Sequence, residues 1–108
     1  MSAAFGVKIG INPISWSNDD LPSLGGETPL EVALGEGKRI GYQGFELGNK
    51  FPRESNALRS VLSAHGLELV SGWYSGRLAR RSAEDEIAAV GPHLRAWCWA
   101  RLRPRYSP

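Results

Sequence analysis

Three strand-like stretches of this chain each pass from apolar residues to polar or aromatic residues at their C-terminal end. They cover residues 7–16, 44–50 and 67–74. Helix-forming segments separate them, and this alternation predicts parallel strands joined by right-handed crossovers. Polar side chains at the C-terminal ends of such strands form the active-site face of a β/α-barrel. We therefore predict an α/β fold: the first three β/α units of a TIM (β/α)8 barrel, truncated, with an irregular C-terminal tail.

Composition limits the remaining classes. A length of 108 residues suits one small domain, and 42% hydrophobic and 22% charged residues are ordinary for a soluble chain. No apolar stretch approaches the ~20 residues of a membrane helix, and the N-terminus lacks a secretory pattern. The one cysteine, Cys98, excludes an internal disulfide. We expect a cytoplasmic protein with no membrane partner.

The net charge of +2 is unevenly distributed. Residues 1–94 carry nine Lys/Arg and all eleven Asp/Glu, whereas the last fourteen residues carry four Arg and no acid. The basic isoelectric point of about 9.0 therefore comes from the tail. An Arg/Trp/Tyr-rich tail has the composition of a nucleic-acid contact, so a non-enzymatic binding module stays open as an alternative.

Helix boundaries follow from capping patterns. Thr28, Pro29 and Glu31 predict a capped helix start, and Gly41 predicts its end. Pro52 predicts the start of a second helix. A third is expected to open at Ser82, with an inward face carrying Ile87, Val90 and Leu94, and Pro92 is expected to kink or end it.

The tail breaks this pattern. Residues 1–94 are predicted to form the barrel segment, and residues 95–108 an aberrant basic tail that is out of frame or disordered. A fourth strand is due after residue 95, but Trp97, Cys98 and Trp99 stand there instead. The codons for Trp-Cys-Trp-Ala, read two bases later, encode Val-Leu-Gly, a plausible helix end. We therefore hypothesise that the reading frame is lost near residue 95.

Glu46 is the strongest catalytic candidate. It lies between Phe45 and Leu47, so strand alternation places its carboxylate on the face opposite that apolar pair. A carboxylate facing a barrel interior is costly unless it is paired, and such a position commonly serves binding or proton transfer. The structural alternative is an ion pair with Lys50.

The other candidates also have two interpretations. Asn12 can bind a substrate hydroxyl or carbonyl, or cap the turn into Pro13. Lys50 can neutralise an oxyanion as a second catalytic residue, or only pair with Glu46. Trp16 and Trp73 can cover the apolar face of a sugar or cyclitol ring, or fill the barrel mouth. Two scattered histidines and no ligand cluster predict no metal site within this chain.

Four blocks carry a family resemblance. They are Gly-Ile-Asn-Pro-Ile-Ser-Trp-Ser-Asn-Asp-Asp at 10–20, Leu-Gly-Gly-Glu-Thr-Pro at 24–29, Gly-Phe-Glu-Leu-Gly-Asn-Lys-Phe-Pro at 44–52 and Glu-Leu-Val-Ser-Gly-Trp-Tyr-Ser-Gly at 68–76. Together they closely resemble the inosose dehydratase family of the xylose-isomerase-like barrels, over roughly residues 7–94. A sugar isomerase or epimerase of the same superfamily is the nearest enzymatic alternative.

The resemblance implies a hydro-lyase of myo-inositol catabolism that dehydrates the cyclitol 2-keto-myo-inositol. It also implies a divalent metal, manganese or cobalt, held at the tips of the fourth and later strands. This chain does not reach those strands, so we expect it to bind no cofactor itself and to be inactive alone. The site residues that carry over are Glu46, Lys50, Asn12, Trp16 and Trp73. A nucleic-acid partner is not expected on this reading, and the oligomeric state stays open.

Overall fold

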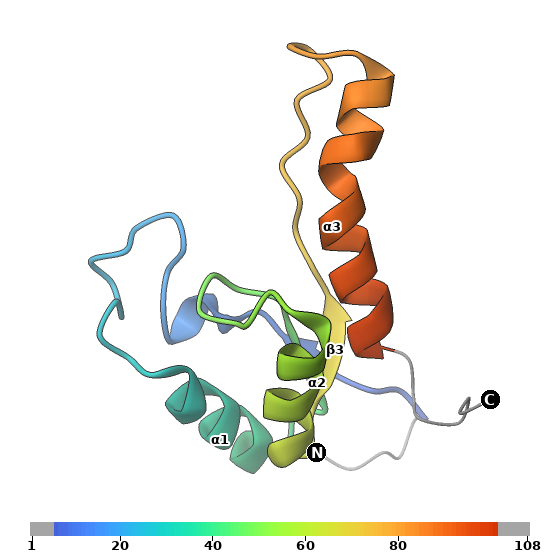
Figure 1. The fold of residues 1–108 in the computed structure, drawn as a ribbon. Helices are drawn as coiled ribbons and strands as arrows, with labels where there is room; N and C mark the ends of the chain where they lie inside the picture. Colours follow the sequence, from blue (N-terminus) through green and yellow to red (C-terminus); the bar gives the residue numbers. More distant parts are fainter. Residues whose placement is uncertain (1–5, 102–108) are drawn as a thin grey trace, which may run out of the picture.

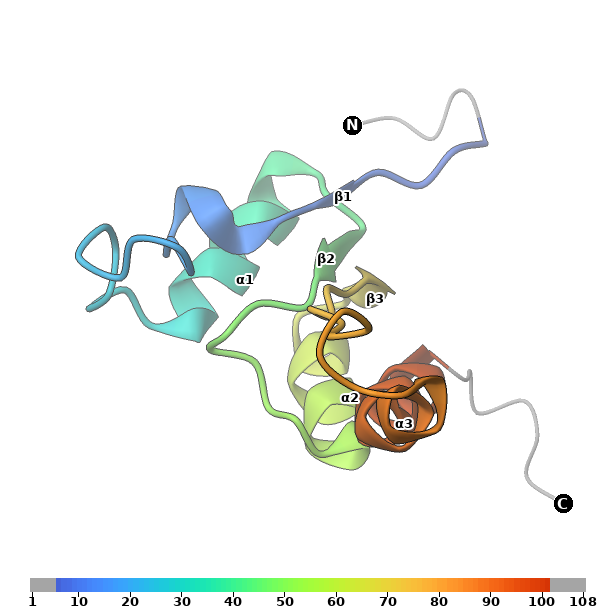
Figure 2. The ribbon, with the colours of Figure 1, turned by 90° about the horizontal axis from the view of Figure 1, so that it is seen from above.

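A parallel three-stranded sheet forms the centre of the computed structural model, which describes residues 6–101. Its strands are β1 (Gly10–Ile11), β2 (Gly44–Glu46) and β3 (Glu68–Ser71), in the order β1-β2-β3. They alternate with helices α1 (Leu30–Ile40), α2 (Ser55–Ala64) and α3 (Ala83–Arg101) (Figure 1). Helix α1 lies beside β1 and β2, whereas α2 and α3 pack against each other next to β3 (Figure 2). The three predicted β/α units are thus confirmed, and the closed barrel stays a prediction.

Strand β1 is much shorter than the stretch 7–16 suggests. Pro13 has no N–H to donate to a ladder, and residues Pro13–Ser15 turn into a 3-10 helix. In a regular strand over this stretch, Val7, Ile9 and Ile11 would share one face and pack beneath the helices. Only Ile11 contacts the core, while Val7 is 63% and Ile9 41% exposed. Both precede the two residues that pair with β2, so they lie outside the packed part of the strand.

The core fills the space between sheet and helices. Phe45 from β2 is fully buried, and its ring approaches α1 at Gly37, where an added Cβ would lie 2.4 Å from the ring's Cζ. A residue without a side chain is therefore required there. The remaining buried apolar side chains come from all three units: Ala33, Leu34, Leu47, Phe51, Leu58, Leu62, Leu67 and Leu69.

Two helices begin differently from the prediction. Thr28 does not cap α1, because the extended Pro29 occupies the capping position and no side chain bonds the first turn. Helix α2 begins at Ser55 rather than at Pro52, because the Glu54 carboxylate accepts hydrogen bonds from the N–H groups of Asn56 and Ala57. The end of α1 is as predicted, since Gly41 adopts a left-handed φ of 115° and closes the last turn.

Helix α3 opens as predicted, with the Asp85 N–H donating to Ser82 Oγ at 3.1 Å. Its predicted inward face is wrong, since Ile87 is 69% and Leu94 49% exposed. The first half of α3 rises away from the sheet beside the connection 72–82 (Figure 1). The buried face is the adjacent one, about 100° around the helix. It carries Glu86, which pairs with Arg81 at 3.2 Å.

The irregular tail is a wrong prediction for residues 95–101, which continue α3 to Arg101. Pro92 lies inside the helix and does not end it, although it lacks the N–H for one backbone hydrogen bond. Leu, Arg and Ala favour helix beyond it, and Trp97 and Ala100 pack against the core. Residues 102–108 lie outside the described part of the chain. The proposed division at residue 94 and the loss of frame stay predictions.

Candidate functional site

Three polar side chains meet where the parallel strands end. Asn12 follows β1, Glu46 is the last residue of β2, and Ser71 is the last residue of β3. Parallel strands present their carboxyl ends at the same edge of a sheet, so residues far apart in sequence come together there. Phe45 and Leu47 are buried in the core, and Glu46 points to the opposite face as alternation predicted.

Asn12 caps the turn that follows β1, as one of its two interpretations predicted, and its substrate contact stays a prediction. Its Oδ1 accepts a hydrogen bond of 2.8 Å from the Ile14 N–H and so caps the 3-10 helix. Its Nδ2 donates to Glu46 Oε1 at 2.5 Å. The amide is therefore oriented by the turn and in turn holds one oxygen of the carboxylate.

The second oxygen of Glu46 is held by Ser71, whose hydroxyl donates to Oε2. The predicted alternative, an ion pair between Glu46 and Lys50, does not form between these two described residues. Both Glu46 oxygens are engaged by neutral donors instead. Such donors hold a carboxylate in a fixed orientation while its remaining lone pairs stay available.

Glu46 lines a cavity of about 450 Å³, a volume within the range of small-molecule sites. Asn12 and Trp73 line it too, and their substrate contacts stay predictions. The Trp73 indole is 78% exposed and donates its Nε1–H to Ser75 Oγ at 3.2 Å. An indole face and a carboxylate in one cavity match a polyhydroxylated ring, whose C–H face is apolar and whose rim carries hydroxyls.

Further charged groups in this cavity were missed by the sequence reasoning. Asp19 and Asp20 from the loop after β1 line it together with Arg53, so three carboxylates face one guanidinium. The Asp19 carboxylate accepts a hydrogen bond from the Asn49 N–H at 3.1 Å, which ties that loop to the end of β2. The balance of charge is negative, and it disfavours an anionic ligand.

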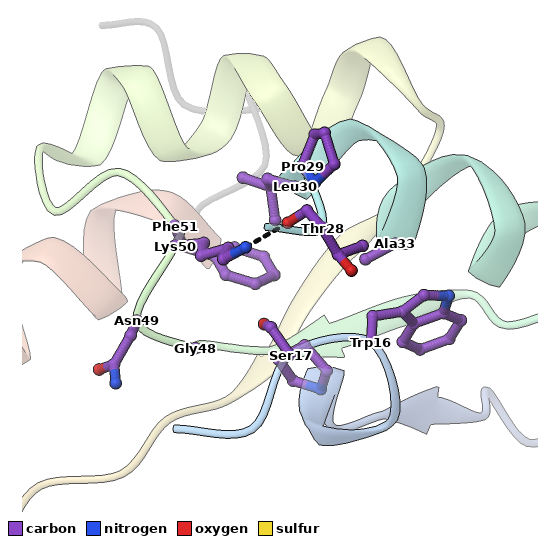
Figure 3. Close-up of a pocket in the computed structure, with 11 residues that line it drawn as sticks. Trp16, Ser17, Thr28, Pro29, Leu30, Ala33, Gly48, Asn49, Lys50 and Phe51 are labelled. Carbon is purple, nitrogen blue, oxygen red and sulfur yellow. Dashed lines mark hydrogen bonds between the residues drawn. The ribbon is translucent and has the colours of Figure 1, made fainter. Parts of the chain in front are cut away.

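Lys50 lies elsewhere. Its ammonium group donates to the carbonyl oxygens of Gly25 at 3.2 Å and Gly26 at 2.8 Å, and also to that of Thr28 (Figure 3). An ammonium has three N–H donors, so these three carbonyls use all of them. In this arrangement Lys50 fastens the loop after β1.

Trp16 also turns away from the 450 Å³ cavity. Its ring packs 5.6 Å from that of Phe45, and its Nε1–H donates to Glu36 on α1 at 2.6 Å. Trp16 and Lys50 instead line a space of about 10 Å³, which holds one water molecule at most (Figure 3). The structure therefore brings Asn12, Glu46 and Trp73 together and leaves Trp16 and Lys50 outside that group.

Residues 6–101 contain no group of three or more His, Cys, Asp or Glu side chains placed to hold a metal ion. The divalent metal implied by the family resemblance thus does not fit the side chains described, and we assign no step through it to them. Within the same range, no helix has the length and apolar character needed to cross a bilayer.

Comparisons with known proteins agree with the resemblance. No family model matches the chain. It is 57% identical over 88 residues to the rhizopine catabolism protein MocC of Rhizobium meliloti, covering 82% of this chain and 27% of that protein. It is 42% identical over 87 residues to an inosose dehydratase of Geobacillus thermodenitrificans, covering 81% of this chain and 29% of that enzyme.

A further inosose dehydratase, from Mesomycoplasma hyopneumoniae, is 47% identical over 70 residues, which are 65% of this chain and 23% of the enzyme. The chain therefore spans about a quarter of the length of the curated relatives it matches.

Proposed function

Because this chain belongs with the inosose dehydratases over the quarter of their length that it spans, we propose that it is the N-terminal part of such a hydro-lyase. The reaction proposed is dehydration of 2-keto-myo-inositol, a ring ketone rich in hydroxyls. A proton leaves the carbon next to the ketone, and hydroxide leaves the following carbon as water. Such a reaction needs a base, an acid for the leaving hydroxyl and stabilisation of charge on the ketone oxygen.

Glu46 is the residue of this chain suited to move the proton. One observation carries this role: a carboxylate fixed by two neutral donors lines a cavity large enough for a cyclitol. Asn12 binds a ring hydroxyl beside it, and Trp73 covers the C–H face of the ring. The chain covers only part of a barrel, so we propose that it has no turnover alone.

The predicted roles of Lys50 and Trp16 carry an extra requirement. Lys50 must release carbonyl groups of residues 25–28 before it can reach an oxyanion. Trp16 must break its bond to Glu36 and leave the ring of Phe45. In the arrangement described here, we propose that Lys50 and Trp16 both support the loop after β1, which lines the cavity.

The charge of the cavity bears on the enzymatic alternative, a sugar isomerase or epimerase, where its substrate is phosphorylated. A sugar-phosphate isomerase must hold a dianionic group, and such sites use Arg, Lys or helix N-termini. Three carboxylates against one guanidinium favour an uncharged polyol instead. The nucleic-acid alternative loses one of its aromatic residues, because Trp97 packs against the core.

The test is a hybrid enzyme in which this chain's matched segment replaces the corresponding 87 residues of the Geobacillus thermodenitrificans inosose dehydratase. We expect the hybrid to dehydrate 2-keto-myo-inositol with added manganese or cobalt and to ignore phosphorylated ketoses. A folded hybrid without dehydratase activity would overturn the proposal.

The origin of the tail has its own test. Sequencing the coding DNA past codon 94 and translating all frames should show another frame that continues into a Val/Ile-rich fourth strand. If no frame continues the barrel, the tail is genuine and the proposal that the frame is lost near residue 95 is wrong.

A further inference from the structure

The ladder between β2 and β3 is irregular at the position that matters most for the site. Phe45 pairs with Leu69, but the next residue of β2, Glu46, pairs with Ser71. Val70 is therefore an extra residue on β3, and the two strands form a β-bulge there. Such bulges re-aim side chains and are over-represented beside active sites.

Two glycines accommodate the extra residue. The Val70 side chain lies over the sheet where two glycines leave room for it: an added Cβ would be 2.6 Å from Val70 Cγ2 at Gly10 and 2.5 Å from Val70 Cγ1 at Gly44. Gly10 and Gly44 stand two residues before Asn12 and Glu46, so all four belong to the same face of the sheet. The Val70 side chain is accommodated on this face, and the side chain of Ser71 lies on the same face.

The consequence is a contact that a regular ladder would not make. In a regular register Val70 would pair with Glu46, and Ser71 would point to the opposite face. With the bulge, Ser71 Oγ donates to Glu46 Oε2, while the Ser71 carbonyl accepts the Leu47 N–H at 2.9 Å. Ser71 thus fixes both the carboxylate and the backbone that follows it.

We propose that Ser71 is a positioning residue of this site, and that the bulge at Val70 places its hydroxyl against Glu46. Asn12 holds one carboxylate oxygen and Ser71 the other, so the plane of the carboxylate is set by two strands at once. The proposal rests on the proposed function for its purpose, namely aiming Glu46 at a substrate proton. Its geometric part does not depend on any substrate.

The geometric part is tested in the 108-residue chain by NMR of the Asn12 side-chain amide, which reports on Glu46 because it donates to that carboxylate. Glu46→Gln supplies the reference for a lost carboxylate contact. Ser71→Ala should move the Asn12 signals toward that reference, whereas Ser71→Thr, which keeps a hydroxyl, should stay with the wild type. Ser75→Ala is the matched control, because Ser75 accepts from Trp73 in the same cavity.

Ser71→Ala spectra that match the wild type would overturn the proposal. So would wild-type Asn12 signals that already coincide with those of Glu46→Gln. A second readout separates positioning from simple support of the fold. In the hybrid, Ser71→Ala should lower kcat and leave KM for 2-keto-myo-inositol near its original value, because the substrate still binds while the carboxylate is no longer aimed at its proton. Ser71→Thr should restore kcat.

The two proposals fail in different ways. A hybrid that is inactive while Ser71→Ala still moves the Asn12 amide signals would support the contact between Ser71 and Glu46 and overturn the proposed reaction. An active hybrid in which Ser71→Ala changes neither the Asn12 amide signals nor kcat would overturn the positioning role alone.

Discussion

Glu46 and Lys50 stand four residues apart, yet their charged groups have opposite surroundings. The Glu46 carboxylate is held by two side chains and lines a cavity of about 450 Å³. The Lys50 ammonium donates its hydrogen bonds to loop carbonyls, and Lys50 lines a space of about 10 Å³. Glu46 is still inside β2, where alternation fixes its direction, whereas Lys50 lies beyond the strand end. The comparison separates a group that can meet a ligand from one that holds the structure together.

The largest expected effect is on turnover. In the hybrid, Glu46→Gln keeps the shape of the side chain but replaces one carboxylate oxygen with an NH2 group, which can neither take a proton nor accept a hydrogen bond. We expect kcat/KM to fall by about 10²- to 10⁴-fold, the usual contribution of a general acid or base. The matched control is Glu36→Gln, which changes a carboxylate bonded to Trp16 outside the cavity. An equal loss of kcat/KM in both variants would show that Glu46 has no special role in proton transfer.

A smaller effect is expected from Lys50→Met, and on stability more than on chemistry. Without the ammonium, the carbonyls of residues 25–28 lose a shared charged donor. Hydrogen bonds of this kind contribute about 1–3 kcal/mol to the free energy of unfolding. Urea unfolding of the chain measures this. Lys38→Met is the control, because Lys38 makes one exposed bond of 3.0 Å to the Gly66 carbonyl. A Lys50→Met variant of unchanged stability but abolished turnover would instead favour a catalytic Lys50.

The two indoles extend the same comparison to ligand binding. Trp73→Ala in the hybrid should raise KM for 2-keto-myo-inositol by about three- to tenfold, the range of a lost ring contact. Trp16→Phe should leave KM near its original value, because Trp16 faces Phe45 and Glu36. Steady-state kinetics in which Trp16→Phe raises KM and Trp73→Ala does not would show that the ligand lies beside Trp16 rather than Trp73.

The sequence predicted these features unevenly. Alternation located Glu46, because a residue between two buried neighbours on a paired strand can face only one way. It could not locate Ser71, because the extra residue Val70 shifts the register and reverses the direction that alternation predicts. The positions of Lys50 and Trp16 outside the cavity could not be predicted, for another reason. Their partners, in residues 25–28 and on α1, are brought near only by the fold of an irregular loop.

The predicted start of α2 and the predicted buried face of α3 were wrong because other interactions outweighed the sequence pattern. Pro52 is a valid start signal, but the Glu54 side chain bonds two N–H groups and moves the first turn to Ser55. In α3, an apolar pattern predicted the buried face, but the helix packs through the adjacent face that carries Glu86 and Trp97. A tail that lacks periodicity can still form helix when its residues individually favour it.

The smallest expected effect concerns the cap of α2. Hydrogen bonds from the N–H groups of Asn56 and Ala57 lower the pKa of Glu54 below its ordinary value of 4.5. A carboxylate with a lowered pKa stabilises the folded state above the ordinary value, and this contribution is lost as the pH falls through the lowered one. Glu54→Gln should therefore lower the melting temperature slightly at pH 7 and not at pH 2. If Glu54→Gln lowers the melting temperature equally at pH 2, the stabilisation does not depend on the charge of Glu54.

In the arrangement proposed here, the ligand contacts the Glu46 carboxylate and not the Lys50 ammonium. The most direct measurement is a crystal structure of the metal-loaded hybrid with 2-keto-myo-inositol bound. We predict a hydroxyl or C–H group of the ring against the Glu46 carboxylate, a hydroxyl within about 3.2 Å of Asn12, and Lys50 still on the carbonyls of residues 25–28. A ligand bonded to the Lys50 ammonium, with Glu46 left in contact with Asn12 and Ser71 alone, would contradict it.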